Sequence, residues 1–506
     1  MFCKKCGAPL VEGANFCDKC GTSVSETSSQ EAVKINYNPI TSSISPATKS
    51  KFKLKNILIL AAALVVFVIG AIVFSSIKSS KSSTENSIYS RYPVEITWKK
   101  SHKQDHAMNF ESNYVKEGIY NAIEQIGGTV DRSKEIMLSD CYEITYLYIS
   151  AGLDSVQSDF DKLAELDNLK YLHVDGQDIS DISALTDLEY IESLDLSGCP
   201  VNDIAALENK STITSLYFDG ASFTDYSVLT TLNNLGTLEL NNMSSPINVD
   251  SIAELTSLKW LSLNGNNLSD IEFLSNCKDI NHLSIENNNI TDLTPITEMS
   301  NLEFIYFEDN KVVDISPLKG KELVGVSFNN NLVTDISPLE GYELVSLEAA
   351  NNLISDVSVL KDMTDLDELD LSDNNIEDIS SLNNLGSIHD IKLSNNNITD
   401  ISSILNYESL NTLEIANNDI DGDLTMFEHL TKLSTLDITG TKISSLEGVA
   451  KLEKLSTLNF GNTPINDITP LFDSSVKSLC FDVDNFNTND VETLKNNSVL
   501  VFKYVE

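Results

Sequence analysis

The sequence repeats with a period of 21 or 22 residues from about residue 166 onward, and this repeat constrains the fold most strongly. The unit reads L-x-x-L-x-L-x-x-N-x-I-x-D-I-x-x-L, with clear copies at 258–274, 366–382 and 388–404. Its ninth position is asparagine in eight successive copies: Asn266, Asn288, Asn310, Asn331, Asn352, Asn374, Asn396 and Asn418. So short a unit cannot bury its own apolar side chains, so the copies must stack on one another. The repeat therefore predicts a solenoid.

The pattern inside each unit predicts how one coil of the solenoid is built. In each L-x-L stretch one residue faces a core and its neighbour faces out, which is the period of a strand. The asparagine side chain has donors and an acceptor, so we expect it to bond main-chain groups in the turn after the strand. Proline within 314–318 and 335–339 disfavours a long helix and predicts short 3-10 or extended returns.

These motifs resemble the leucine-rich repeat family, and within it the bacterial internalin-like class with 22-residue units. The resemblance covers about 350 residues. It implies an α/β solenoid: a curved horseshoe with a parallel sheet on its concave face, where this family usually binds. We assign the repeats to 151–475, a helical N-terminal cap to 108–150 and a C-terminal cap to 476–506.

An aspartate recurs before the isoleucine that follows each turn, for example at Asp270, Asp314 and Asp335. A row of carboxylates could bind calcium, or each could cap its own return turn. The stacking keeps successive carboxylates apart, and no loop offers the six to eight converging oxygens that calcium takes. We therefore favour the capping interpretation.

An uncharged run interrupts the chain before the repeats. Residues 57–74 contain no polar side chain, and 56–77 would reach about 30 Å as a helix, enough to span a membrane. Four lysines precede this run closely and two follow it, which places the N-terminus in the cytoplasm. We predict a single-pass plasma-membrane protein with a flexible cytoplasmic linker at 23–55, an extracellular stalk at 78–107 and an extracellular repeat domain.

Four cysteines near the N-terminus form a C-x2-C-x10-C-x2-C pattern: Cys3, Cys6, Cys17 and Cys20. Each pair is followed by a glycine, which permits the tight turn of a metal-binding knuckle. Four thiolates suit one structural Zn²⁺, and so small a unit needs metal to fold. Residues 1–22 thus resemble the short zinc ribbon of many bacterial membrane proteins. Zinc-bound thiolates persist best in a reducing compartment, which also places the N-terminus in the cytoplasm.

The net charge of −41 is unevenly distributed. Residues 1–55 have a net charge of +4, whereas the residues after the apolar run have a net charge of −45. Nucleic acid is not an expected partner, because phosphates need basic side chains. The sequence contains no hydrolase, phosphate-binding or metalloprotease motif, so we do not expect an enzyme. We interpret the four cysteines after the apolar run as unpaired thiols.

Large side chains occupy predicted concave positions in the first half of the repeats: Tyr171, Tyr217, Trp260, His282, Phe304 and Tyr306. Acidic side chains hold these positions in the second half. The face could be merely solvated, or its aromatic residues could anchor a partner. We predict a surface protein that binds a protein or other macromolecule through this face. The alternative is a transmembrane sensor that couples external binding to the zinc ribbon.

Overall fold

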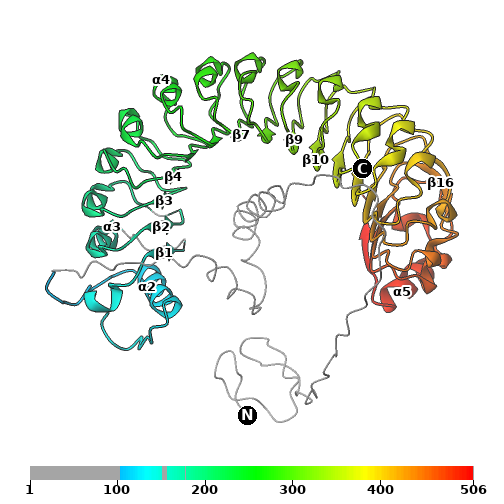
Figure 1. Ribbon diagram of the computed structural model, residues 1–506. Helices are drawn as coiled ribbons and strands as arrows, with labels where there is room; N and C mark the ends of the chain where they lie inside the picture. The colour runs from blue at the N-terminus through cyan, green and yellow to red at the C-terminus, as the bar shows by residue number, and fades with distance from the viewer. Residues whose placement is uncertain (1–102, 151–156, 177, 505–506) are drawn as a thin grey trace, which may run out of the picture. The chain divides into compact units, whose positions relative to one another are not determined.

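The computed structural model describes residues 103–150, 157–176 and 178–504, which form a curved solenoid (Figure 1). The four N-terminal cysteines and the predicted membrane span at 56–77 lie outside these residues. Within the described ranges, no helix is long and apolar enough to cross a membrane.

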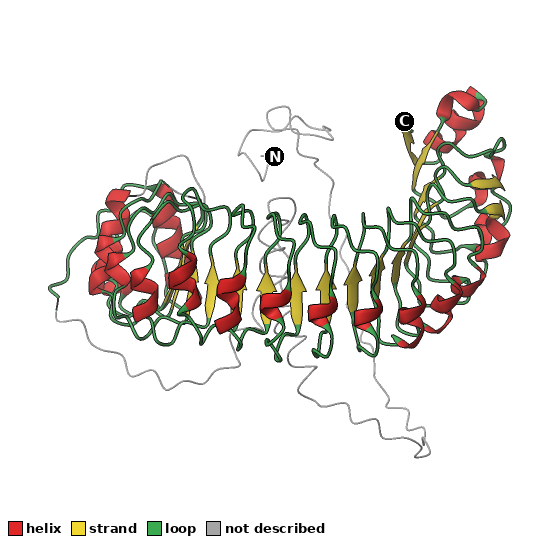
Figure 2. Cartoon of the chain, turned by 90° about the horizontal axis from the view of Figure 1, so that it is seen from above, coloured by secondary structure: helices red, strands yellow, loops and turns green. Residues whose placement is uncertain are grey.

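A 17-stranded parallel sheet lines the inner side of the arc, and the return segments form its outer side (Figure 1). Figure 2 shows the strands side by side along the solenoid. The strands of this sheet are β1 (Tyr146–Ile149), β2 (Tyr171–Val174), β3 (Ser193–Asp195), β4 (Ser215–Tyr217), β5 (Thr237–Glu239), β6 (Trp260–Ser262), β7 (His282–Ser284), β8 (Phe304–Tyr306), β9 (Gly325–Ser327), β10 (Ser346–Glu348), β11 (Glu368–Asp370), β12 (Asp390–Lys392), β13 (Thr412–Glu414), β15 (Thr435–Asp437), β17 (Thr457–Asn459), β18 (Ser478–Phe481) and β19 (Leu500–Lys503).

Short 3-10 helices make most of the returns, as the prolines predicted. They are η3 (Leu138–Cys141), η4 (Asp161–Glu165), η5 (Ser183–Asp187), η6 (Ala205–Leu207), η7 (Ser227–Thr231), η8 (Glu272–Asn276), η9 (Thr294–Ile296), η10 (Ser316–Leu318), η11 (Ser337–Leu339), η12 (Ser358–Asp362), η13 (Ser380–Asn384), η14 (Ser402–Ile404), η15 (Leu424–Phe427), η16 (Val449–Lys451), η17 (Thr469–Asp473) and η18 (Val483–Asn485). Two extended pieces, β14 (Asp421–Asp423) and β16 (Lys442–Ser445), pair in parallel as a separate small sheet. The predicted leucine-rich repeat solenoid with short returns is thus confirmed.

α-Helices stand mainly at the two ends of the solenoid. They are α2 (Asn113–Gln125), α3 (Gln157–Phe160), α4 (Val249–Ala253) and α5 (Thr488–Asn496). At the first end, α2 packs on β1, and Ser112 caps it by accepting the Tyr114 N–H. The buried Asp159 of α3 accepts the Ser112 N–H at 2.6 Å and so ties this helix to the first coils. At the other end, α5 precedes the last strand, β19.

The core is a stack of aliphatic layers, one layer from each coil. The central residue of each strand points inward; Leu261, Leu283 and Ile305 are fully buried, for example. A second buried row follows the strands and includes Phe307 and Phe328, whose rings stack at 5.5 Å. Each coil buries its apolar side chains against its neighbours, so no coil has a core of its own.

The ladder asparagines connect each coil to the one before it. The Asn310 amide donates to the carbonyl oxygens of Phe307 and Glu308 in its own coil and to that of Ile285 in the preceding coil, at 2.9–3.1 Å. Its oxygen accepts the Ile290 N–H at 2.9 Å. The same four contacts recur from Asn288 to Asn418. Each amide therefore pairs main-chain groups that the turn would otherwise leave unpaired.

The recurring aspartates cap the return turns. The Asp314 carboxylate accepts the Ser316 N–H at 2.7 Å, and Asp335 and Asp356 do the same for Ser337 and Ser358. Hydrogen bonds from the backbone N–H and hydroxyl of Ser358 lower the pKa of Asp356. The part of the chain that the structure describes contains no group of acidic, histidine or cysteine side chains that could hold a metal ion.

The ladder geometry makes a prediction about stability. Asn310→Ala should lower the free energy of unfolding by about 1–3 kcal/mol, because it leaves the buried Ile290 N–H without an acceptor and removes one of two donors from each of three carbonyls. Asn375 is exposed and lies one position beyond the ladder residue Asn374, so Asn375→Ala is the matched control and should cost far less. Urea unfolding of the two variants measures the difference. Equal losses would contradict the role assigned to the ladder.

Candidate binding face on the concave sheet

The strand register places the six predicted concave residues in two rows. Trp260, His282 and Phe304 are register partners on β6, β7 and β8, in the first row. Tyr171 occupies the same row on β2, several strands away. The second row contains Tyr217 on β4 and Tyr306 on β8. The structure thus brings three of the predicted residues together in one row and places Tyr306 on the same strand as Phe304.

Trp260, His282 and Phe304 form a continuous stack, which we call the aromatic ridge. The centroids of successive rings are 4.2 Å apart, and the rings are inclined by 10° and 25°. Trp260 and Phe304 are half-buried, whereas His282 between them is only 9% exposed. Because the ring faces cover one another, the ridge presents ring edges to the open side of the sheet. Such a stack is a rigid apolar surface with little side-chain entropy left to lose.

Gly325 on β9 gives the last ring its position. It is the register partner of Phe304, and a Cβ atom at Gly325 would lie 2.9 Å from Cδ1 of the Phe304 ring. Any other residue would therefore push Phe304 from its place. The sequence analysis did not assign this role to Gly325. The sequence does show a glycine there, at a position where the other strands have a residue with a side chain.

Carboxylates lie on both sides of the aromatic ridge. Burial, together with the charges of Asp219 and Asp195, raises the pKa of Glu239 to about 7, and a hydrogen bond from Trp260 opposes the rise. Burial and the charge of Glu286 likewise raise the pKa of Glu308 to about 7. The sequence predicts acidic side chains at the concave positions of the second half, and the structure adds carboxylates in the first half. Asp195 and Glu239 lie in the second row, and Asp219, Glu286 and Glu308 lie in a third row just after the strands, which the expectation did not consider.

A histidine held between aspartates lies near the first end of the face. His173 Nδ1 is 2.6 Å from Asp195, and its Nε2 is 3.3 Å from Asp175, which also accepts the Tyr148 hydroxyl at 2.7 Å. Burial lowers the pKa of His173, but hydrogen bonds and charges from the two aspartates outweigh it and raise the pKa overall. The sequence analysis did not bring these residues together, because Tyr148 and Asp195 come from the coils on either side of His173.

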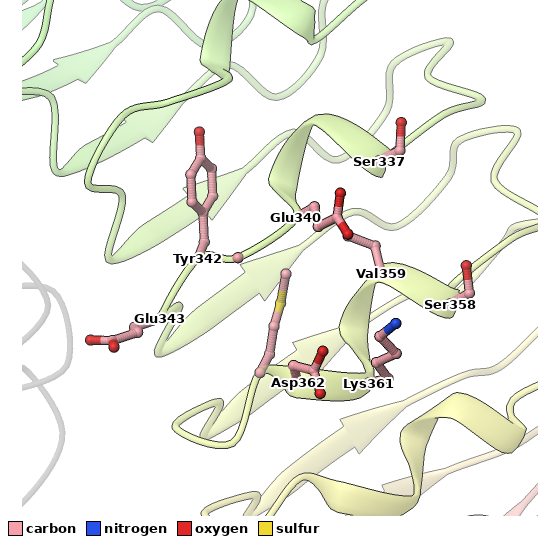
Figure 3. A pocket seen from close by; sticks show the side chains of 10 residues that line it. Ser337, Glu340, Tyr342, Glu343, Ser358, Val359, Lys361 and Asp362 are labelled. Atoms are coloured by element: carbon pink, nitrogen blue, oxygen red, sulfur yellow. The ribbon is translucent and has the colours of Figure 1, made fainter. Parts of the chain in front are cut away.

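A hollow of about 350 Å³ lies between the returns η11 and η12 and is a separate feature from the concave face (Figure 3). Side chains of both charges line this hollow, among them Glu340, Lys361 and Asp362. Figure 3 shows Glu340 just after one return and Lys361 and Asp362 on the next. None of the predicted binding residues lies there.

The buried position of His282 predicts how stability depends on pH. Burial lowers the pKa of His282 from 6.5 to about 4. Folding therefore favours the neutral ring, so this contribution to stability is full above pH 6.5 and is lost as the pH falls towards 4. Between pH 7 and pH 5 the wild type should lose about 2 kcal/mol more than His282→Phe, which keeps a ring and cannot titrate.

Urea unfolding at the two pH values measures this difference, with the exposed His429→Phe as control. An unchanged pH dependence in His282→Phe would contradict the burial of a neutral imidazole in the ridge.

Comparisons with known proteins agree with this architecture. A family model described as leucine-rich repeats (2 copies) matches residues 256–298, and a zinc-ribbon domain model matches residues 2–24. No curated protein matches the sequence significantly.

Solved structures with the same solenoid come from several organisms. An internalin from Listeria monocytogenes is 28% identical with a TM-score of 0.52, and the match covers 71% of this chain and 98% of that one. A leucine-rich repeat protein of Leptospira interrogans is 18% identical with a TM-score of 0.53, covering 71% and 90%. The ectodomain of an Arabidopsis thaliana membrane receptor kinase is 18% identical with a TM-score of 0.53, covering 68% and 48%. The chain thus combines leucine-rich repeats in an internalin-like solenoid with an N-terminal match to a zinc ribbon.

Proposed function

We propose that this chain is a membrane-anchored bacterial surface protein whose extracellular repeat domain binds a protein partner through the concave sheet. The aromatic ridge is the observation on which the proposal rests. The protein would act by recognition, in adhesion or a similar surface role, and not by catalysis.

The ridge suits recognition because it is apolar, ordered and partly exposed. Aromatic side chains dominate the residues that contribute most to protein interfaces. The ring stack fixes the side chains before any partner arrives, so binding loses little rotamer freedom there. Tyr306, half-buried on the same strand as Phe304, extends the surface towards the third row. The Arabidopsis receptor ectodomain was solved in complex with Casparian strip integrity factor 2, so a solenoid of this fold can bind a partner.

The N-terminal part of the proposal concerns metal and membrane. Cys3, Cys6, Cys17 and Cys20 would hold one structural Zn²⁺, and the zinc-ribbon match spans all four cysteines. The apolar run at 56–77 would anchor the chain, with the lysine-rich flank on the cytoplasmic side. The zinc ribbon would then lie in the cytoplasm and the repeats outside the cell.

The proposed topology can be tested on intact cells. Added protease should degrade the repeat domain and leave a fragment of roughly residues 1–77 protected, because the membrane shields the cytoplasmic side. Immunoblotting against tags at each terminus detects the two parts, and lysed cells provide the control. Protection of the repeat domain in intact cells would contradict the orientation.

The proposed binding face can be tested once a partner is identified. Trp260→Ala should weaken binding by at least about 2 kcal/mol, because it removes the first ring of the ridge. Leu332→Ala is the control, since Leu332 is an exposed apolar residue, at 46%, outside the strands. Titration by biolayer interferometry measures both. Wild-type affinity in a Trp260→Ala, Tyr306→Ala double variant would place the binding site elsewhere.

A further inference from the structure

Three carboxylates gather at the carboxyl end of strands β7 to β10, whereas the aromatic ridge lies at the other end of the strands. They belong to Glu286, Glu308 and Glu348, and we call them the carboxylate group. Glu286 and Glu308 occupy the third row on adjacent coils, and Glu348 is on β10 in the second row. The charges of all three raise the pKa of Tyr306, after burial, to about 12. The register agrees with this, because Tyr306 pairs with Ser284 of β7 on one side and with Ser327 of β9 on the other.

Neighbouring polar side chains hold two of these carboxylates in place. Glu286 accepts the Ser284 hydroxyl at 2.8 Å, and Glu348 accepts the Asn329 amide at 3.1 Å. Neutral donors of this kind fix a carboxylate without neutralising its charge.

Glu308 differs from its two neighbours at one oxygen. The Ser327 side chain is a hydrogen-bond partner of this carboxylate, but its Oε2 is buried and has no partner, although the side chain as a whole is only half-buried. Among the described residues, no lysine, arginine or histidine lies within ion-pair distance of the carboxylate group; the concave ion pairs instead join His173 to Asp195 and Lys392 to Asp370. A buried acceptor without a partner is costly, so a cation that reaches Glu308 would gain more than one at an ordinary surface pair.

The ridge and the carboxylate group lie at opposite ends of the same strands. Phe304 is four residues before Glu308, which corresponds to about 13 Å along a strand. A partner that crosses the sheet in the strand direction would meet an apolar surface first and a negative one next. In an extended peptide the same separation is also about four residues.

We infer that the concave face takes a basic polypeptide segment, with an apolar side chain on the ridge and a lysine or arginine side chain at Glu286, Glu308 and Glu348. This inference rests on the proposed function and adds the chemistry of the partner to it. A metal ion suits the group less well, because the described residues contain no metal-binding cluster, whereas a lysine or arginine side chain brings its own donors in a flexible arm. The net charge of −45 beyond residue 77 would also draw a basic segment towards the face.

The experiment selects short random peptides by display on the full-length protein held in lipid nanodiscs. Affinities of the selected peptides are then measured by fluorescence anisotropy for the wild type, for Trp260→Ala and for Glu286→Gln, Glu308→Gln. The control is Glu340→Gln, Glu343→Gln, which removes two exposed carboxylates outside the strands. Unfolding midpoints show whether each variant is folded. If the Glu308 substitution prevents folding, the double variant is replaced by Glu286→Gln alone, tested together with peptides whose basic residue is changed to an acidic one.

We expect the selected peptides to have a lysine or arginine about four residues from an aromatic or aliphatic residue. The Glu286→Gln, Glu308→Gln variant should bind these peptides about tenfold or more weakly than the wild type, and the control variant should lose much less affinity. In the Glu286→Gln, Glu308→Gln variant, replacing the peptide's basic residue should cause no further loss of affinity. Peptides that depend on Trp260 but not on the two glutamates would overturn this inference and leave the proposed function standing. Peptides that depend on neither would overturn both.

Discussion

The side-chain amide of the ladder asparagine is the contact on which the solenoid depends. From Asn288 to Asn418 it bonds two carbonyls of its own turn, one carbonyl of the preceding coil and one N–H of that coil, as Asn310 shows. No other side chain of this size offers two donors and an acceptor in this arrangement. Because the contact crosses from coil to coil, it fixes both the turn and the stacking distance. At Thr441 the hydroxyl replaces only the donor to its own coil.

The binding face follows from this regular stacking. Successive coils in register place side chains of equivalent positions next to one another, so three aromatic residues 22 positions apart become one stack. The same register sets glutamates of neighbouring coils together, where burial and mutual repulsion raise the pKa of Glu308. The ridge and the carboxylates are therefore consequences of one repeat, and their positions are fixed before a partner binds.

The sequence alone predicts the coil but not the contacts between coils. The spacing of the asparagines gave the register, and the L-x-L stretches located the strands, so Trp260, His282 and Phe304 could be placed in one row. Whether they stack depends on ring orientation, and the last ring, Phe304, depends on the space over Gly325. Glu308 was missed because the expectation stopped at the strand, whereas the alternation continues beyond it through the buried Phe307 to the half-buried Glu308. A further unpredicted feature is the left-handed residue before each ladder asparagine, such as Asp309 with φ of 52°.

If the proposed function is right, the partner binds the concave sheet and not the return segments. Site-specific photocross-linking in living cells tests this directly. A photoreactive amino acid would replace Ser346, the first-row residue on β10 beside Gly325, or Glu340, which is exposed just after η11. We predict a covalent adduct with a partner protein from position 346 and none from position 340. Adducts from position 340 alone would contradict the assignment of recognition to the concave face.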